Sequence, residues 1–269
     1  MNVGIKRMND RLIVDKIFSD GVVLQRDTKN KIYGYDKPGQ KIKLSLCNVD
    51  YETYANESGY WEILLDKKEN SGPHQMLIQG SKIKIIGEVF FGEVFLIGGQ
   101  SNMETPISRV FDLYEKELLD YFNSKNQAVI HQFTMAKEYA FTKGEGGIES
   151  GKWSELSPDT AEFFSAIGYF FARKYQSDHK GLNIGLIQVA VGGSPIEAWC
   201  DEELIRKYRK KQVAELEKCR RENYIKNQIE VEEKSLKAWM KDLLERDIYK
   251  NDPRKVDLLS DPNSNKSEE

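Results

Sequence analysis

The sequence predicts an α/β protein in three parts, and three patterns along the chain support this prediction. Short runs in which apolar and polar residues alternate fill residues 1–90 and are typical of an antiparallel β-sandwich. Over residues 91–200, apolar runs alternate with helical patterns, which is typical of a parallel sheet with crossover helices. Residues 201–269 are rich in charged side chains and indicate a helical insertion or tail.

In the first part, alternating apolar residues mark the strands and turn formers separate them. The alternation is clearest at Ile42, Leu44 and Leu46, at Trp61, Ile63 and Leu65, and at Ile83 and Ile85, with turns expected at residues 37–39, 56–59 and 70–73. His74 is assigned to a turn and is expected to be exposed. Because no cluster of titratable groups stands out, we interpret this part as a structural or ancillary module.

The second part begins with an expected buried strand at residues 94–97, which ends in Gly98-Gly99. A helix is predicted over residues 111–122, a strand over 128–135 and a glycine-rich loop over 143–152. The next helix is expected to begin at Ser157, which is able to cap it, with Pro158 in its first turn and a buried body over residues 163–175. A last strand over residues 184–191 closes on a second glycine pair, Gly192-Gly193.

The third part carries apolar residues at helical spacing, as at Leu236, Trp239 and Leu243. This spacing predicts one or two long amphipathic helices that end by Asp252-Pro253, and residues 261–269 are expected to be disordered. No heptad repeat persists, which favours a solvated helical face over a coiled-coil partner site.

Composition excludes several classes of protein. With 40 basic and 43 acidic residues and a net charge of −3, nothing points to nucleic acid or an anionic membrane surface as a partner. Three cysteines without Cys-x-x-Cys spacing argue against a disulfide framework and a zinc site. The amino terminus lacks the apolar run of a signal peptide and no segment approaches a membrane span, so a cytoplasmic protein is expected.

Three hydrogen-bonding side chains, Gln100, Ser101 and Asn102, follow Gly98-Gly99 at the carboxyl end of the predicted strand. Open α/β sheets bind their ligands at this end, which makes Ser101 a candidate nucleophile. The alternative is a strand-to-helix turn in which Ser101 or Asn102 caps a helix, and residue chemistry alone favours it because the Gly-x-Ser-x-Gly elbow is absent. The two glycine pairs are suited to donate backbone N–H groups to an oxyanion.

Several motifs, in order along the chain, resemble the sialate O-acetylesterase family, a branch of the SGNH hydrolases. The segment Gly99-Gln100-Ser101-Asn102-Met103-Glu104 resembles the family's nucleophile block, and Val191-Gly192-Gly193-Ser194-Pro195-Ile196-Glu197-Ala198-Trp199 resembles its second block. Shorter matches lie at residues 20–26, 33–34, 37–39, 87–89, 92–94, 151–153 and 164–171. The resemblance covers about residues 18–200 and favours the nucleophile over the helix cap.

The resemblance implies a carbohydrate O-acetylesterase with a flavodoxin-like three-layer α/β domain, of which residues 91–200 would form the first half. Ser101 would be the nucleophile, and the N–H groups of Ser101, Gly192 and Gly193 would line the oxyanion hole. Gln100, Asn102 and Glu197 would shape the pocket or support the turns. An O-acetylated sugar is the implied substrate, and no metal or cofactor is implied.

This sequence departs from the family pattern in its catalytic base. The family's third block and its late Asp-x-x-His block are not found, and His74, His131 and His179 are interpreted as ordinary core or surface residues. The first hypothesis is therefore the amino-terminal part of an esterase that needs a carboxyl-terminal half or a second polypeptide. The second is a non-catalytic carbohydrate-binding or interaction protein derived from such an esterase.

Overall fold

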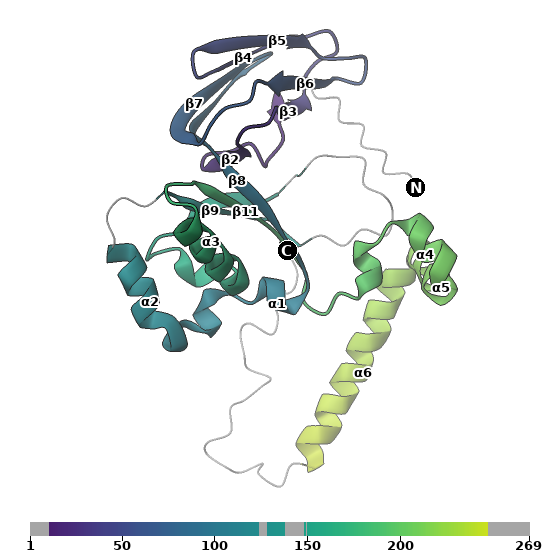
Figure 1. The fold of residues 1–269 in the computed structure, drawn as a ribbon. Coiled ribbons are helices and arrows are strands. Elements are labelled where there is room, and N and C mark those ends of the chain that lie inside the picture. Colours follow the sequence, from purple (N-terminus) through teal and green to yellow (C-terminus); the bar gives the residue numbers. More distant parts are fainter. Residues whose placement is uncertain (1–10, 124–127, 138–147, 149, 247–269) are drawn as a thin grey trace. The chain divides into compact units, whose positions relative to one another are not determined.

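The structure is a computed structural model, which describes residues 11–123, 128–137, 148 and 150–246 (Figure 1). The chain forms two compact units, Met1–Cys200 and Asp201–Glu269. The first unit spans the predicted boundary at residue 90, and the division into three domains stays a prediction.

The described part of the first ninety residues forms mostly antiparallel strands around one apolar cluster. Strands β1 (Ile13–Val14), β3 (Asn30–Tyr35) and β6 (Tyr60–Leu65) make a three-stranded sheet, while β4 (Lys41–Leu46) pairs with β5 (Val49–Tyr54) and β7 (Ser71–Gln79) in the larger sheet. Both sheets contribute buried side chains to the cluster, such as Trp61 from β6 and Leu44 from β4. The predicted alternation matches the buried positions of β4 and β6, whereas Ile83 and Ile85 are exposed. The sandwich arrangement stays a prediction.

His74 differs from its prediction, because it lies within β7 and is half-buried. Its Nε2 atom is 3.0 Å from the hydroxyl of Ser71 and its ring is 6.1 Å from that of Phe91. The turn formers at residues 70–73 therefore sit at the start of a strand, where β7 pairs irregularly with its neighbour.

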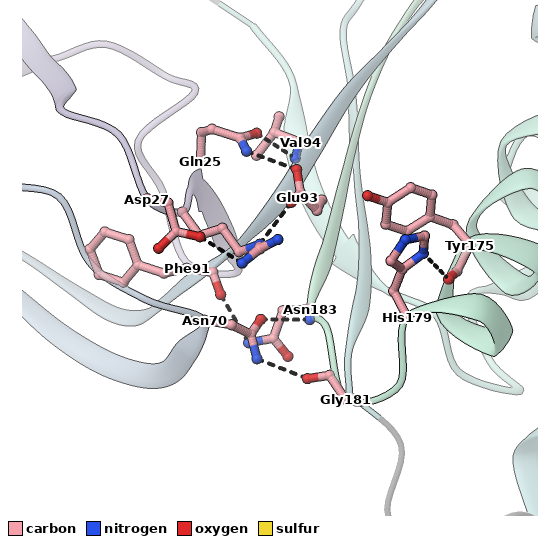
Figure 2. Close-up of polar contacts among 11 residues, drawn as sticks. Gln25, Asp27, Asn70, Phe91, Glu93, Val94, Tyr175, His179, Gly181 and Asn183 are labelled. Carbon is pink, nitrogen blue, oxygen red and sulfur yellow. Dashed lines mark hydrogen bonds and ion pairs between the residues drawn. The ribbon is translucent and has the colours of Figure 1, made fainter.

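Strand β8 (Ile83–Gly99) is 17 residues long and belongs to both halves of the first unit (Figure 1). Its residues 83–91 pair with β7, and β2 (Val22–Gln25) runs parallel to its residues 89–92. Side chains at the end of β2 continue this contact, because Gln25 and the following residue, Arg26, donate hydrogen bonds of 2.8 and 2.7 Å to the carboxylate of Glu93 (Figure 2). The amide oxygen of Gln25 also accepts from the N–H of Val94 at 2.8 Å.

Beyond Gly92, β8 enters a sheet with the strand order β10-β9-β11-β8. Strands β9 (Ile130–Thr134) and β11 (Ile184–Ala190) are parallel to β8, and β10 (Lys152–Glu155) is antiparallel to β9. Apolar residues of these strands and of helices α2 (Phe111–Asn123) and α3 (Ala166–Asp178) share a second buried cluster, which includes Ile97, Leu118, Tyr169 and Leu186. The alternation of strands and helices confirms the predicted α/β class.

Helix α3 begins later than predicted. Residues 157–160 form turns, a short 3₁₀ helix η2 (Ala161–Phe163) follows, and Ser165 rather than Ser157 caps α3 by accepting from Gly168 N–H at 3.2 Å. Phe164 is extended between the two helices because its carbonyl accepts from Ile107 N–H at 2.8 Å. Lys152, predicted in a loop, starts β10, and most of the predicted loop lies outside the described residues.

Over its described residues, 201–246, the second unit has three helices where one or two were predicted: α4 (Glu202–Tyr208), α5 (Lys210–Cys219) and α6 (Tyr224–Arg246). Asp201 caps α4, and Glu202 pairs with Arg220 at the end of α5 at 2.7 Å. The predicted helix end at Asp252-Pro253 and the disordered tail lie outside the described residues. Over the described part of the chain, no helix has the length and apolar character that crossing a membrane requires.

Candidate active site

The two glycine pairs lie side by side at the carboxyl edge of the parallel sheet. Gly99 of β8 is in register with Ala190 of β11, and Val191 N–H donates to the Gly99 carbonyl at 3.0 Å. Gly99 and Gly193 have φ angles of +148° and +78°, which side chains rarely adopt, so both turns require glycine. The sheet register thus brings together two motifs that are about 90 residues apart in the sequence.

Ser101 is the first residue of α1 (Ser101–Glu104), a single helical turn directly after β8. Its side chain is exposed, and its hydroxyl donates to the amide oxygen of Gln100 at 3.2 Å. The alternative in which Ser101 or Asn102 caps a helix is wrong, because Gln100 occupies the cap position and no side chain caps this helix. Asn102 is exposed on the same turn, next to Ser101.

Glu104 connects the two glycine turns and was missed by the sequence analysis. Its carboxylate accepts from Gly192 N–H at 2.5 Å and forms an ion pair with Lys137, which follows β9. This ammonium holds the pKa of the Glu104 carboxyl below its ordinary value. A side chain at position 192 would meet that carboxylate, because a Cβ there would lie 2.6 Å from its oxygen and 3.9 Å from the Cα of Ser101.

Hydrogen bonds between buried side-chain amides connect α1 to strands β11 and β9. Gln188 of β11 donates to the Met103 carbonyl at 3.0 Å and accepts from Gln132 of β9 at 3.1 Å. The oxygen of Gln132 in turn accepts from Ser165 N–H at 3.0 Å, at the start of α3. Gln132, Ser165 and Gln188 are all buried, so these bonds fix the turn that carries Ser101 against a rigid frame.

A pocket of about 400 Å³ opens next to these turns. It is lined by Gly98, Gly99, Gln100, Ser194, Ile196 and Trp199. Trp199 ends the 3₁₀ helix η3 (Ile196–Trp199), and its indole N–H donates to the Ser194 hydroxyl at 2.9 Å. Glu197, predicted to support the site, lies half-buried on η3 and does not line the pocket.

None of the three histidines lies at this edge of the sheet. His131 is in register with Gly185, and Gly185 is in register with Val94 of β8. Val94 lies five residues before Gly99, so at ~3.3 Å per residue His131 is about 16 Å from the end of β8 along the strands. His179 follows α3, before β11 begins, and stacks on Tyr175 with ring centroids 4.3 Å apart (Figure 2). His74 lies in β7, level with Val89, still further from Ser101 along β8.

His131 is a core residue, as predicted. Only 1% of it is exposed, and its Nδ1 atom donates to the Gly21 carbonyl at 2.5 Å. Its Nε2 atom is buried without a hydrogen-bond partner among the described residues, and burial lowers the pKa of the imidazole. The neutral ring is therefore the form that the fold accommodates. Within the described residues, no group of three or more histidine, cysteine, aspartate or glutamate side chains is placed to hold a metal ion.

Comparison with known protein families identifies the relatives of this chain. The family model described as SASA, carbohydrate esterase, sialic acid-specific acetylesterase, matches residues 91–229. The chain belongs to this family. The match covers both glycine turns and the strands that carry them, so the predicted resemblance is confirmed.

Members of the sialic acid-specific acetylesterase family resemble the chain in sequence and in fold. The sialate O-acetylesterase of Mus musculus is 26% identical over 200 residues, which are 69% of this chain and 37% of that protein, and that of Homo sapiens is 26% identical over 204 residues. A carbohydrate acetylesterase from Xanthomonas citri has a similar structure, with a TM-score of 0.66 and 29% identity over 72% of this chain and 43% of its own. The chain thus spans less than half the length of these relatives.

Proposed function

We propose that this chain is the nucleophile-bearing part of a carbohydrate O-acetylesterase and that Ser101 attacks the acetyl carbonyl. The observation that carries the proposal is the pairing of Ser101 with the Gly192-Gly193 turn through Glu104. In the reaction, the Ser101 hydroxyl adds to the carbonyl carbon, a base takes its proton, and negative charge develops on the carbonyl oxygen. As this intermediate collapses, the base returns the proton to the leaving oxygen and the sugar alcohol departs. Water then hydrolyses the acetylated serine, which releases acetate and restores the hydroxyl.

The oxyanion donors that fit this proposal are the N–H groups of Ser101 and Gly193. Gly192 was also expected to donate, but its N–H is bound to the Glu104 carboxylate. Among the described residues, the N–H groups of Ser101 and Gly193 have no acceptor. Gly192 therefore fixes the turn, while Gly193 is free to face the substrate. Gln100 and Asn102 border the nucleophile, and Glu197 supports the second turn from η3.

We propose that the base comes from outside these 269 residues, and the separation of all three histidines from Ser101 supports this. We propose an Asp-x-x-His segment in a longer form of the protein, or in a second polypeptide. The greater length of the matched relatives supports this view. Removing the base from a hydrolytic serine lowers turnover by several orders of magnitude.

The distance of every histidine from Ser101 also favours a second candidate function, a carbohydrate-binding protein without catalysis. Such a protein would bind acetylated sugars in the pocket beside Gly99 and leave the ester intact. It would not respond to the addition of an Asp-x-x-His segment.

Ester hydrolysis with and without the added segment separates these functions. We expect turnover of an acetylated sugar only when a segment carrying Asp-x-x-His is present, and its loss in Ser101→Ala. Ser58→Ala, which alters an exposed turn serine of the first ninety residues, is the matched control and should keep full activity. Normal turnover by this chain alone that survives Ser101→Ala would refute the nucleophile assignment. Sugar binding with no turnover in either form would favour the binding protein.

A further inference from the structure

The pocket beside Ser101 has one aromatic wall, formed by Trp199. We propose that the indole of Trp199 stacks on the ring of the sugar and thereby places the attached ester at Ser101. This inference rests on the proposed function, because it assigns a sugar-binding role to a side chain of the same site. It makes Trp199 a residue that selects the sugar rather than the ester.

The orientation of Trp199 is fixed by its neighbours. Its indole N–H donates to the Ser194 hydroxyl at 2.9 Å, and the backbone N–H of Ser194 donates to the Val191 carbonyl at 3.1 Å. Val191 is in turn bonded to Gly99, the residue that ends β8. Three successive hydrogen bonds therefore connect the indole to Gly99, next to the turn that holds the nucleophile. An aromatic ring held in this way loses little freedom when a ligand binds.

Exposure shows that Trp199 is not a core residue. It is 39% exposed and its neighbour Ile196 is 67% exposed, although both are large apolar side chains. With its polar N–H already bonded to Ser194, the indole presents only its ring to a ligand. Adjacent exposed apolar side chains beside a nucleophile are typical of a binding surface.

Glycine backbone forms another part of the pocket lining and leaves space for a ring. Gly98 and Gly99 line the pocket and have no side chains. The pocket volume of about 400 Å³ falls in the ~300–1,000 Å³ range of small-molecule sites. A ligand can thus lie between the indole and the glycine backbone, with its ester directed to Gln100 and Ser101.

The chemistry of this wall selects a sugar ring. The face of an indole carries negative electrostatic potential, so it attracts groups that are weakly positive and poorly hydrated. A pyranose presents such a face, because its axial C–H groups lie on one side while its hydroxyls point outward. The hydroxyl edge would then meet polar groups such as Gln100. A small acetyl ester without a sugar has no such face and gains little from Trp199.

Binding by the whole chain provides the test, since it does not require turnover. The chain is titrated with methyl glycosides of 6-O-acetylglucose, 2-O-acetylxylose and 9-O-acetylneuraminic acid, and the four indole N–H signals are followed by NMR. We expect the Trp199 signal to shift on binding, and the dissociation constant to rise about tenfold in Trp199→Ala. Trp199→Phe keeps a ring and should lose only about threefold. Trp239→Ala removes an exposed tryptophan of the second unit and should bind as the unchanged chain does.

The outcomes separate this inference from the proposed function. Binding of none of the three glycosides, or equal affinity in Trp199→Ala and the unchanged chain, would overturn the role of Trp199. Unchanged thermal unfolding of Trp199→Ala is required for its loss of affinity to count. In the completed enzyme, Trp199→Ala should raise KM for the sugar ester by a larger factor than KM for 4-nitrophenyl acetate, and equal factors would contradict the stacking role. If instead hydrolysis survives Ser101→Ala while glycosides still need Trp199, the nucleophile assignment fails and the stacking role stands.

Discussion

Replacing Asn183 by alanine should destabilise the first unit strongly, because this side chain joins three separate segments, one of them at Phe91 (Figure 2). Its amide nitrogen donates to the carbonyls of Ser71 and Phe91 at 3.1 and 3.2 Å, and its oxygen accepts from Val129 N–H at 3.3 Å. Its backbone N–H donates to the side chain of Asn70 at 2.8 Å. Asn183 thus connects the start of β7, the middle of β8 and the entry to β9 just before β11 begins.

The magnitude follows from the number of bonds and from burial. Asn183 is 8% exposed, so the three backbone groups left behind by alanine gain little access to water. At about 1 kcal/mol for each hydrogen bond, the free energy of unfolding should fall by about 3 kcal/mol. With a urea dependence of about 3 kcal/mol per molar, the midpoint of unfolding should fall by about 1 M.

Equilibrium urea unfolding of the whole chain, followed by tryptophan fluorescence, measures this change. Two of the four tryptophans, Trp61 and Trp153, are buried in the first unit and report on its unfolding. Asn227→Ala is the matched control, because Asn227 is exposed on α6 of the second unit. A loss below about 0.5 kcal/mol in Asn183→Ala, or an equal loss in the control, would refute the reasoning, since buried amide bonds would then contribute little here.

Three further predictions concern the site and the core. In the completed enzyme, Glu104→Ala should lower kcat about 100-fold with little change in KM, because the turn at Gly192 loses the carboxylate that accepts its N–H. Glu104→Gln keeps an acceptor and should lower kcat less. Equal losses of kcat in the two variants would contradict this role. Burial lowers the pKa of His131 in the folded chain. Below about pH 6.5 the unfolded chain therefore binds a proton that the folded chain does not. The free energy of unfolding should then decrease by up to about 1.4 kcal/mol per pH unit as the pH falls. Urea midpoints at pH 7.5 and 5.5 measure this slope, and His131→Gln should reduce it. Gly185→Ala would place a Cβ 2.7 Å from the Cβ of Val23, which should lower the free energy of unfolding by about 1–3 kcal/mol, and an unchanged urea midpoint would contradict such close packing.

Elements whose signal is local could be predicted from the sequence. The strands at Ile42–Leu46 and Trp61–Leu65 and the helix after Phe111 are marked by their own apolar periodicity, which the fold preserves. Where a tertiary contact decides, prediction failed. Ser157-Pro158 has the local signals of a helix start, but turns and the short helix η2 follow, and Phe164, whose carbonyl accepts from Ile107 N–H, is extended before α3 begins. Helices α4 and α5 are separated at Arg209, and no glycine or proline at this position predicts the break.

The candidate site likewise has residues that the sequence predicts and one residue that it does not. Ser101 and the two glycine pairs follow strands that were recognisable, so their position at one edge of the sheet could be expected. The role of Glu104 could not, because its partner Gly192 is 88 residues away in the sequence. Its only signal was its position at the end of the nucleophile block, one helical turn after Ser101. The register of β8 and β11 is what turns that position into a contact.

The long strand β8 has a consequence for how such proteins can recombine. Residues 89–92 pair with β2 while the next seven residues pair with β11, so the junction between the two halves is itself a strand and contains no linker. If two parent genes were recombined at residue 90, strand β8 would be cut. Each part of it would then continue into a segment that evolved with a different sequence. The first ninety residues therefore cannot be exchanged as an independent cassette, and tolerated breakpoints should fall at the boundary between Cys200 and Asp201. Chimaeras made at these two positions would differ in solubility for this reason.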